Sequence, residues 1–423
     1  MTTTTLDRHR MRELFDLRGS YNELTGGLYG EDPYPIWRRL RSERPVHRGT
    51  VHELTGISDQ LYFQGLPFPD RPHFSAFSFE ACNEAFRNPK VFASSPEAVD
   101  ADPEKGSLGH NSMLSMGGVQ HRRYRGLVQP SFLPSNAEWW IRNWIEETVH
   151  LLIDGFVGDG SAELNVDFCA AIPVLTITGS FGVPMDQALD IRAALTRDHQ
   201  KIVEILTPIV AARREEPQDD LISVLVQAEL PDADGTAQRL SDAEIYTFSL
   251  LLLAAGSGTT WKQMGTTLTA LLQRPEVLEA VRNDRQLLRA AIEETLRWMP
   301  TDPMFSRWVT EDIEFYGQEI PKGSVIHLCV GAANRDPERW ERPEEYDITR
   351  PTRSTLAFGQ GVHTCLGMHV ARGEMTVGIN ALLDRLPGLR LDPAAEPPRI
   401  VGMYERGATA IPVLFDTERD RDV

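Results

Sequence analysis

The chain has 423 residues, of which 41% are hydrophobic and 25% are charged, an ordinary balance for a globular protein. Its 43 basic and 61 acidic side chains give a formal net charge of −18, which argues against general affinity for nucleic acid or for anionic membrane surfaces. The four cysteines, Cys82, Cys169, Cys329 and Cys365, lie far apart without a CxxC pair, so we expect a reducing, cytoplasmic setting.

The N-terminal residues carry no apolar stretch typical of a signal peptide. The longest strongly apolar run, residues 250–255, is far shorter than the roughly 20 residues that a membrane-spanning helix needs. We therefore expect no membrane association. Residues 1–30 are predicted to be a polar, loosely ordered segment, and residues 31–423 a single domain.

In chain order, residues 32–41 read as a helix start with proline in the first turn. Residues 46–79 favour short strands, and residues 97–119 read as a loop. Helical patterns dominate from residue 133 to about residue 300, with one long helix starting near Ser241. Strand-like pieces follow at 313–316 and 325–330. The pattern predicts a mainly α fold with a minor β portion.

Residues 358–367 read Phe-Gly-Gln-Gly-Val-His-Thr-Cys-Leu-Gly, and an apolar helical pattern begins directly after them. Cys365 would therefore lie at or just before a helix N-terminus, where unpaired N–H groups and the helix dipole favour a thiolate. Glycines allow the backbone to approach a flat, bulky group closely. A cysteine thiolate can carry haem iron.

This run resembles the haem-binding loop of the cytochrome P-450 superfamily, the haem-thiolate monooxygenases, and the helical body with a minor β portion is similar to that family's fold. The resemblance implies haem b as cofactor, with Cys365 as the axial ligand of its iron. It also implies that further residues contact the haem: Phe358, Gly359, Gly367, His121, Arg125, Arg307 and His363. His121 and Arg125 lie four apart, on one face of a helix.

Glu294 and Arg297 lie three apart on a helix, a spacing that alone most often marks a surface ion pair of little consequence. By resemblance they form, with Arg350, the family's buried charge network behind the haem loop. That role is structural, and loss of one partner would be costly because it leaves a buried charge unpaired.

Within the long helix, residues 254–260 resemble the family's oxygen-binding groove, whose pattern is Ala-Gly-x-acid-Thr-Thr. The resemblance assigns Ala255, Gly256, Thr259 and Thr260 to the catalytic groove, with Thr259 as its key hydroxyl. Gly258 stands where the family has Asp or Glu, so the carboxylate that helps to move protons is absent and another group must substitute. Slow turnover, peroxide leakage or peroxide-driven chemistry follows as an alternative.

By resemblance, apolar candidates for the wall of the substrate pocket are Leu251, Ala254, Pro303, Met304, Phe305, Met403 and Tyr404. Glu405 would meet a cationic or hydroxylated substrate or face solvent. The family places two helices and a loop between Pro184 and Arg213, and this interval looks short for them, which predicts an abbreviated lid over residues 185–212 or ordinary loop variation.

The predicted function is a bacterial-type monooxygenase that oxidises a small apolar organic substrate. Because no flavin or iron–sulfur module is present, electrons would come from a separate ferredoxin system docking near Arg122 and Arg123 on the proximal face. One alternative is a haem-thiolate enzyme that uses peroxide or performs coupling or rearrangement. The other is a non-catalytic haem or ligand-binding protein.

Overall fold

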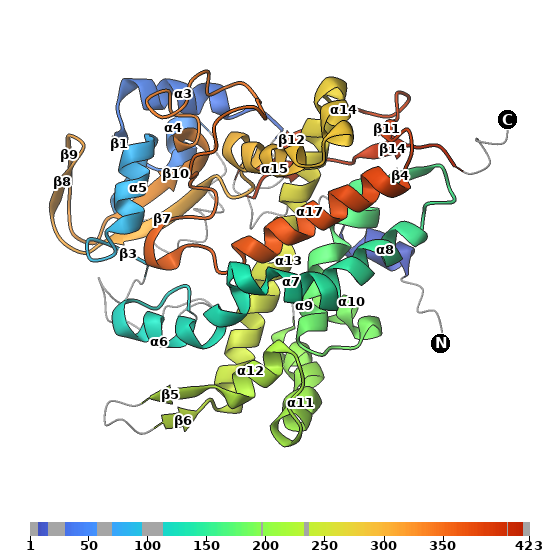
Figure 1. Ribbon diagram of the computed structural model, residues 1–423. Coiled ribbons are helices and arrows are strands. Elements are labelled where there is room, and N and C mark those ends of the chain that lie inside the picture. The colour runs from blue at the N-terminus through green and yellow to red at the C-terminus, as the bar shows by residue number, and fades with distance from the viewer. Residues whose placement is uncertain are drawn as a thin grey trace.

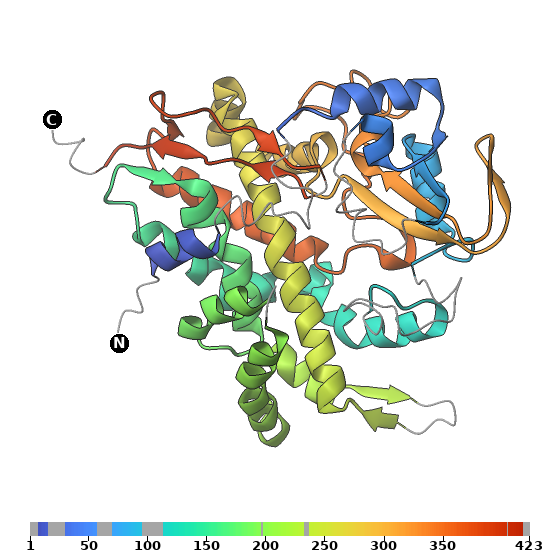
Figure 2. The same cartoon turned by 180° about the vertical axis from the view of Figure 1, so that it is seen from behind.

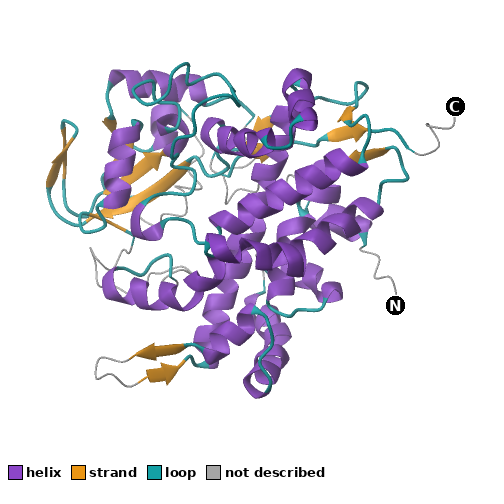
Figure 3. Ribbon diagram, in the orientation of Figure 1, coloured by secondary structure: helices purple, strands orange, loops and turns teal. Residues whose placement is uncertain are grey.

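The structure is a computed structural model that describes residues 7–15, 30–56, 70–94, 113–195, 198–231, 237–403 and 405–417. A large helical body carries a smaller β-rich part on one side (Figure 1). Figure 3 shows the longest strands grouped in that part, with helices filling most of the rest. The predicted fold class, mainly α with a minor β portion, is confirmed.

The helical body contains α6 (Gly118–Val128), α7 (Ala137–Trp140), α8 (Glu146–Asp154), α9 (Ala171–Ser180), α10 (Met185–Ala194), α11 (His199–Glu215), α12 (Leu221–Gln227), α13 (Asp242–Leu272), α14 (Pro275–Asn283), α15 (Leu287–Trp298) and α17 (Met368–Arg385). Shorter helices elsewhere are α1 (Arg8–Leu14), α3 (Tyr34–Glu43), α4 (Val51–Thr55), α5 (Phe79–Arg87) and α16 (Val330–Ala333). Two π-helical turns, Ile141–Ile145 and Asn165–Cys169, precede α8 and α9.

The main sheet has five strands in the order β1 (Val46–Arg48), β2 (His73–Ala76), β10 (Val325–Cys329), β7 (Met304–Val309) and β3 (Phe92–Ala93). Only β10 and β2 pair in parallel. A three-stranded sheet joins β11 (Arg390–Leu391), β14 (Pro412–Leu414) and β4 (Ser161–Glu163). The two-stranded pairs are β5 (Glu229–Pro231) with β6 (Ala237–Arg239), β8 (Ile313–Phe315) with β9 (Gln318–Ile320), and β12 (Ile400–Val401) with β13 (Gly407–Ala408).

Helix α13 is the central element of the helical body. It runs unbroken for 31 residues, although three glycines, Gly256, Gly258 and Gly265, lie inside it. Ser241 caps it as predicted, in a reciprocal capping box with Glu244. Figure 2 shows α13 crossing the whole molecule, and it contacts α9, α11, α15 and α17. The face of α13 that these helices leave uncovered can therefore border a site.

The start of the chain differs from the expectation of loose order. Helix α1 packs against α10, and Met11 and Phe15 are fully buried in the main core. Arg12 donates two hydrogen bonds to the buried Asp167 carboxylate, at 2.8 and 2.7 Å, and Arg8 donates a third at 3.1 Å. These partners lie more than 150 residues away, so the local sequence pattern did not predict them.

The interval after Pro184 does contain two helices, so the prediction that it is too short for them is wrong. Helix α10 has 10 residues and α11 has 17, and only residues 195–198 separate them. The connection can be this short because Asp198 caps α11 directly, accepting a hydrogen bond from Lys201 N–H at 3.1 Å. Helix α11 also continues to Glu215, beyond the interval considered from the sequence.

The predicted loop at 97–119 lies mostly outside the described residues; residues 113–115 form a turn, and α6 already begins at Gly118. Within the described ranges, no single helix is both long enough and apolar enough to cross a membrane. One bent pair, Asn165–Ser180 with Met185–Ala194, passes on length and composition alone, with 108° between its halves.

Candidate active site

Cys365 lies in a tight loop that leads into α17. Its backbone N–H donates to Phe358 O at 2.8 Å, which closes the loop. Gly359 and Gly361 have φ angles of +65° and +75°, in the left-handed region that favours glycine, and a Cβ on Gly361 would lie only 2.5 Å from a backbone oxygen of α5. Gly367 is the N-cap residue of α17. The loop therefore holds Cys365 just before a helix N-terminus, as the sequence predicted.

The Cys365 side chain is accessible, although protein surrounds it on its other sides. Burial raises the pKa of Cys365, while a hydrogen bond from Gly367 N–H and the positive charges of Arg125 and Arg372 lower it. The charge of Asp302 also acts on this sulfur and raises the pKa. The loop thus presents a thiol to open space with anion-stabilising groups beside it.

Four basic side chains from three separate elements gather next to this loop. His121 and Arg125 come from α6, Arg307 from β7, and His363 from the loop itself. The rings of His121 and His363 lie 4.0 Å apart, and Arg125 Nη2 donates to Thr364 O at 2.6 Å. Burial, followed by the charges of His121, Arg307 and Arg125, lowers the pKa of His363 to about 3. The pKa of His121 is lowered as well, so near neutral pH the positive charge of this region comes from Arg125 and Arg307, and the two neutral imidazoles add ring N–H donors for an anion.

One buried ring nitrogen in this region lacks a hydrogen-bond partner within the described part of the chain. His121 Nε2 is buried and has no hydrogen-bond partner among the residues that the structure describes. A buried polar atom without a partner is rare and points to a bound group. An iron porphyrin, with carboxylates at its edge and a metal that a thiolate can hold, matches both the cationic region and Cys365. The residues present fit a haem.

The middle of α13 has an accessible face of small residues. Ala254 and Ala255 are exposed, although the residues before and after them are mostly buried. Thr259, four residues after Ala255, is half-buried, whereas Thr260 is buried. A Cβ on Gly256 would lie 3.2 Å from a side chain of α9, so Gly256 permits close helix packing.

Gly258 differs from its neighbours in this helix. A Cβ added there would meet no heavy atom within 4 Å, so open space lies beside it. Ser257, a sequence-based candidate to replace the missing acid, is buried and directs its hydroxyl to Ala254 O at 3.4 Å. Ser257 is therefore engaged within its own helix.

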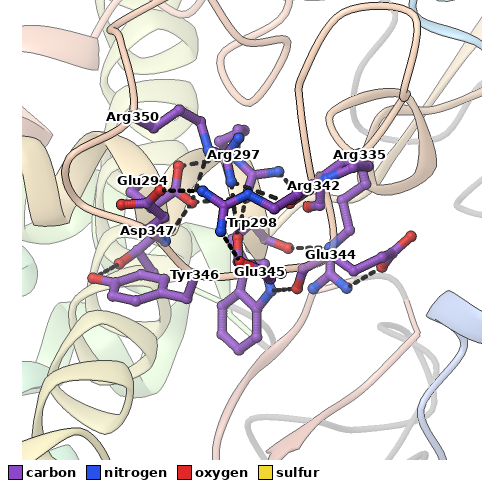
Figure 4. A network of polar contacts seen from close by, with 12 residues as sticks. Glu294, Arg297, Trp298, Arg335, Arg342, Glu344, Glu345, Tyr346, Asp347 and Arg350 are labelled. Atoms are coloured by element: carbon purple, nitrogen blue, oxygen red, sulfur yellow. Dashed lines mark hydrogen bonds and ion pairs between the residues drawn. The ribbon is translucent and has the colours of Figure 1, made fainter.

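Glu294, Arg297 and Arg350 do come together, and Figure 4 shows their side chains directed at one another. Arg297 donates to both Glu294 carboxylate oxygens, at 2.8 and 2.7 Å, and Arg350 Nε lies 3.4 Å from Glu294 Oε1. The Arg297 and Glu294 side chains are only 2% and 5% exposed. Asp347 N–H adds a bond to Glu294 Oε1 at 2.9 Å. The pair is thus a buried network and not a surface ion pair.

The residues predicted to line the substrate pocket differ in how deeply they are buried. Met304 and Met403 are buried in a core cluster around Trp37, so the structure places them in packing and not on an accessible wall. Pro303 is also buried, while Phe305 is half-buried. Tyr404 lies outside the described residues.

Leu251, with Met113, Met116 and Phe248, lines a cavity of about 270 Å³. Of the predicted wall, Leu251, Ala254 and Phe305 therefore remain accessible.

A charged cluster beside α13 was missed from the sequence. Lys262 forms an ion pair with Glu405, so Glu405 does not simply face solvent. The charges of both residues act on Asp302, in the loop before β7. A lysine within an otherwise apolar helical run was the available signal.

A groove of about 550 Å³ includes Cys365, His121 and Arg125 among its lining residues and reaches the surface. It is lined by α6, by the segment after it and by the cysteine loop, and Arg122, Leu133 and Val362 are among its residues. Leu133 and Val362 are large apolar side chains with 42% and 44% exposure. Arg123 is not among the lining residues of this groove.

Comparison with known proteins gives consistent results. The family model "Cytochrome P450" matches residues 183–400. Cytochrome P450 107B1 of Saccharopolyspora erythraea is 36% identical over 412 residues, covering 91% of this chain and 95% of that protein. The cytochrome P450 monooxygenase PikC of Streptomyces venezuelae is 30% identical, covering 93% and 94%.

Among solved structures, the bacillaene polyketide synthase cytochrome P450 PksS of Bacillus subtilis 168 has a TM-score of 0.78 at 26% identity, covering 91% of this chain and 97% of that chain. The family model matches residues 183–400, and the relative and the solved structure each cover 91% of this chain. The chain belongs to the cytochrome P450 family and is a P450 oxidoreductase.

Proposed function

We propose that the chain is a haem-thiolate monooxygenase that inserts one oxygen atom of O2 into an organic substrate with an apolar body, using electrons from a separate ferredoxin and ferredoxin reductase. The observation that carries this proposal is the accessible Cys365 thiol before α17, with a cationic region beside it. The exposed, small side chains of Ala254 and Ala255 on α13 support an accessible distal face.

The proposed cofactor is haem b, with Cys365 Sγ as the axial ligand of iron and with His121, Arg125, Arg307 and His363 as contacts to its carboxylates. Arginine suits this role because its planar fork can bind a carboxylate through two hydrogen bonds. Phe358, Gly359 and Gly367 would shape the loop that approaches the porphyrin face. When bound, the haem supplies the oxygen activation, which a thiolate ligand favours.

The chain's own residues would orient the substrate and handle protons. Thr259 Oγ1 is the proposed hydroxyl that holds a proton on the distal face, next to the turn of α13 that carries Ala255. Thr260 and Gly256 would maintain the helix packing around it. Leu251, Ala254 and Phe305 are proposed to contact the apolar body of the substrate.

For the electron donor, we propose docking at the groove beside Cys365. Arg122 supplies a positive charge on this rim, and Leu133 and Val362 supply exposed apolar contacts. The chain as a whole carries a net charge of −18, so a local basic side chain there helps to orient an acidic partner. Arg123 is proposed only as a more distant contributor.

Gly258 favours a second candidate function, in which peroxide replaces O2 and reduced ferredoxin. No carboxylate stands at this position, and the neighbouring Ser257 hydroxyl is engaged with Ala254 O. Proton supply to the distal face is therefore weaker than in a site with an acid at this position.

The test uses the purified holoenzyme and the compound that shifts the haem optical band most in a library screen. Product that forms only with reduced ferredoxin and O2 supports the monooxygenase. Product that forms with hydrogen peroxide alone, at an equal or higher rate, supports the second candidate. A band shift without product under either condition would contradict both and indicate a binding protein.

We further propose that residues 31–423 form one domain, because the main core draws on residues from α6 to β14 and a second cluster joins Tyr34 and Trp37 to Met304 and Met403. Helix α1, within the segment 1–30, adds Met11 and Phe15 to that core. A cytoplasmic location is proposed from the cysteines, of which Cys82, Cys169 and Cys329 are free and buried.

A further inference from the structure

A cavity of about 270 Å³ lies between α6 and the N-terminal part of α13. We call it the α6–α13 cavity. Met113 and Met116 line it from the segment before α6, and Phe248 and Leu251 line it from α13. Pockets that hold a whole drug-sized ligand usually measure about 300–1,000 Å³, so this cavity suits the end group of a longer molecule.

The only charged side chain among the described residues that line the cavity is Glu244, which is half-buried. Tyr124 Oη of α6 donates a hydrogen bond to Glu244 Oε1 at 2.8 Å. Ser241 donates two hydrogen bonds to Glu244 Oε2, from its backbone N–H at 2.9 Å and from its hydroxyl at 2.7 Å. These three bonds fix the carboxylate at the wall of the cavity.

Glu244 is negatively charged at neutral pH. Burial alone would raise its pKa, but the hydrogen bonds from Ser241 and Tyr124 outweigh burial and lower the pKa. The charge of Arg123 acts on Tyr124, but Arg123 does not line the cavity. Within the described part of the chain, the cavity therefore presents a negative charge without a cation among its lining residues.

Two aromatic rings stand beside this carboxylate. The rings of Tyr124 and Phe248 are stacked, with their centroids 5.5 Å apart and their planes at 16°, and both residues line the cavity. The face of an aromatic ring attracts a cation, and the thioethers of Met113 and Met116 are soft and polarisable. A carboxylate next to aromatic faces and thioethers suits an organic ammonium group better than a neutral or anionic one.

The cavity continues into the accessible face of α13. Leu251 lines the cavity, and the exposed Ala254 and Ala255 follow it by three and four residues, so the three share one face of the helix. From Glu244 to Ala255 the helix advances by 11 residues, which is about 16 Å at a rise of about 1.5 Å per residue. A molecule held at Glu244 by one end can therefore reach the proposed distal site only if it is elongated.

We propose that the α6–α13 cavity binds the ammonium group of an elongated, amphipathic substrate, whose apolar body passes over Leu251 to Ala254 and Ala255. This inference rests on the proposed function, because it names the substrate class of the same site. The carboxylate and the two rings bind the cationic end, and the uncharged face of α13 binds the apolar end.

The first experiment compares two probes that fit the cavity and differ in one charge. Butyrylcholine carries a quaternary ammonium group that cannot coordinate iron, and 3,3-dimethylbutyl butyrate replaces that nitrogen with carbon. Their dissociation constants are measured by calorimetry on the holoenzyme at neutral pH. We expect the cation to bind about tenfold more tightly, which is within the range of a partly desolvated cation–aromatic contact.

Two variants make this comparison specific. Glu244→Gln removes the charge, while glutamine can still cap the helix at this position, so this variant should lose the preference for butyrylcholine. Asp242→Asn makes the same charge change two residues earlier, where the side chain is 57% exposed, pairs with Arg214 and does not line the cavity. It should retain the preference. Haem content and melting temperature of both variants check that the fold is intact.

A longer probe tests the path along α13. Decanoylcholine has the same cationic end and an acyl chain long enough to reach Ala255. It should shift the haem optical band, whereas butyrylcholine should bind without a shift. In Glu244→Gln, the concentration of decanoylcholine that gives half of the shift should rise about tenfold, as the calorimetric preference predicts.

Equal binding of the two short probes by the wild-type protein would overturn the proposal. So would a preference that survives Glu244→Gln, or one that Asp242→Asn also removes, because the cause would then be the overall charge of −18. Binding of decanoylcholine without a band shift would overturn the path along α13. The ferrous carbonyl spectrum of the same samples reports separately on the proposed function, so the two failures are distinguishable.

Discussion

The charge network behind the cysteine loop gives a prediction whose size follows from the structure. Arg297 is 2% exposed and makes five hydrogen bonds: two to Glu294, at 2.8 and 2.7 Å, and three to the backbone oxygens of Asn334, Pro343 and Glu345, at 3.1, 2.7 and 2.9 Å. A lysine keeps the charge but lacks the planar fork that makes these bonds together. Because breaking a buried ion pair costs about 3–5 kcal/mol, we expect Arg297→Lys to lower the free energy of unfolding by about 3 kcal/mol.

The assay is urea denaturation of the holoenzyme, followed by circular dichroism and by haem absorbance. Arg342→Lys is the matched control, since Arg342 is 60% exposed and pairs with Glu345 at 2.8 Å at the surface. An exposed pair contributes about 1 kcal/mol or less, so this variant should stay close to the wild type. Equal losses of stability in Arg297→Lys and Arg342→Lys would refute the assignment of Arg297 to a buried network.

Three further predictions concern single side chains. Gly258→Asp should raise the fraction of electrons that appear in product and lower hydrogen peroxide release, because the open space beside Gly258 admits a carboxylate. If the fraction of electrons in product does not change, the missing acid has no effect. His121→Phe should release haem to apomyoglobin about tenfold faster, because it removes the buried Nε2 atom that is proposed to contact a haem carboxylate and that lacks a partner among the described residues. An unchanged rate of haem release would contradict that contact. Burial raises the pKa of Glu374 to about 8 from an ordinary value of 4.5, so the contribution of this protonated side chain to stability is complete below about pH 4.5 and is lost as the pH rises to about 8. Glu374→Gln should remove this slope of at most about 1.4 kcal/mol per pH unit in denaturation curves, and a slope that persists would place its origin elsewhere.

Sequence reasoning succeeded where the chemistry depends on local spacing. The cysteine loop is a run of ten residues in which Gly359 and Gly361 adopt positive φ angles, and the helix that follows it starts where the apolar pattern starts. Glu294 and Arg297 lie three apart on one helix, so their contact is also a local property. Such features do not depend on how distant segments pack.

Sequence reasoning failed where partners are distant. Lys262 and Glu405 are 143 residues apart, and Arg12 reaches Asp167 across 155 residues, so no periodic pattern connects either pair. Met403 reads equally well as a pocket wall and as core, and only the packed structure assigns it to the core.

The length of the connection between α10 and α11 was misjudged for a related reason. A capping contact at Asp198 starts the second helix at once, which a count of residues does not reveal. The fold class and the position of the thiol were thus predictable, while the charged cluster beside α13 was not.

The most direct test of the whole account is the absorption spectrum of the ferrous carbonyl complex, recorded for the wild-type protein and for Cys365→His. The account predicts the red-shifted band of sulfur ligation in the wild type, and its loss in Cys365→His with haem retained. A wild-type protein without that band, or a Cys365→His variant that keeps it, would show that Cys365 Sγ does not bind the iron.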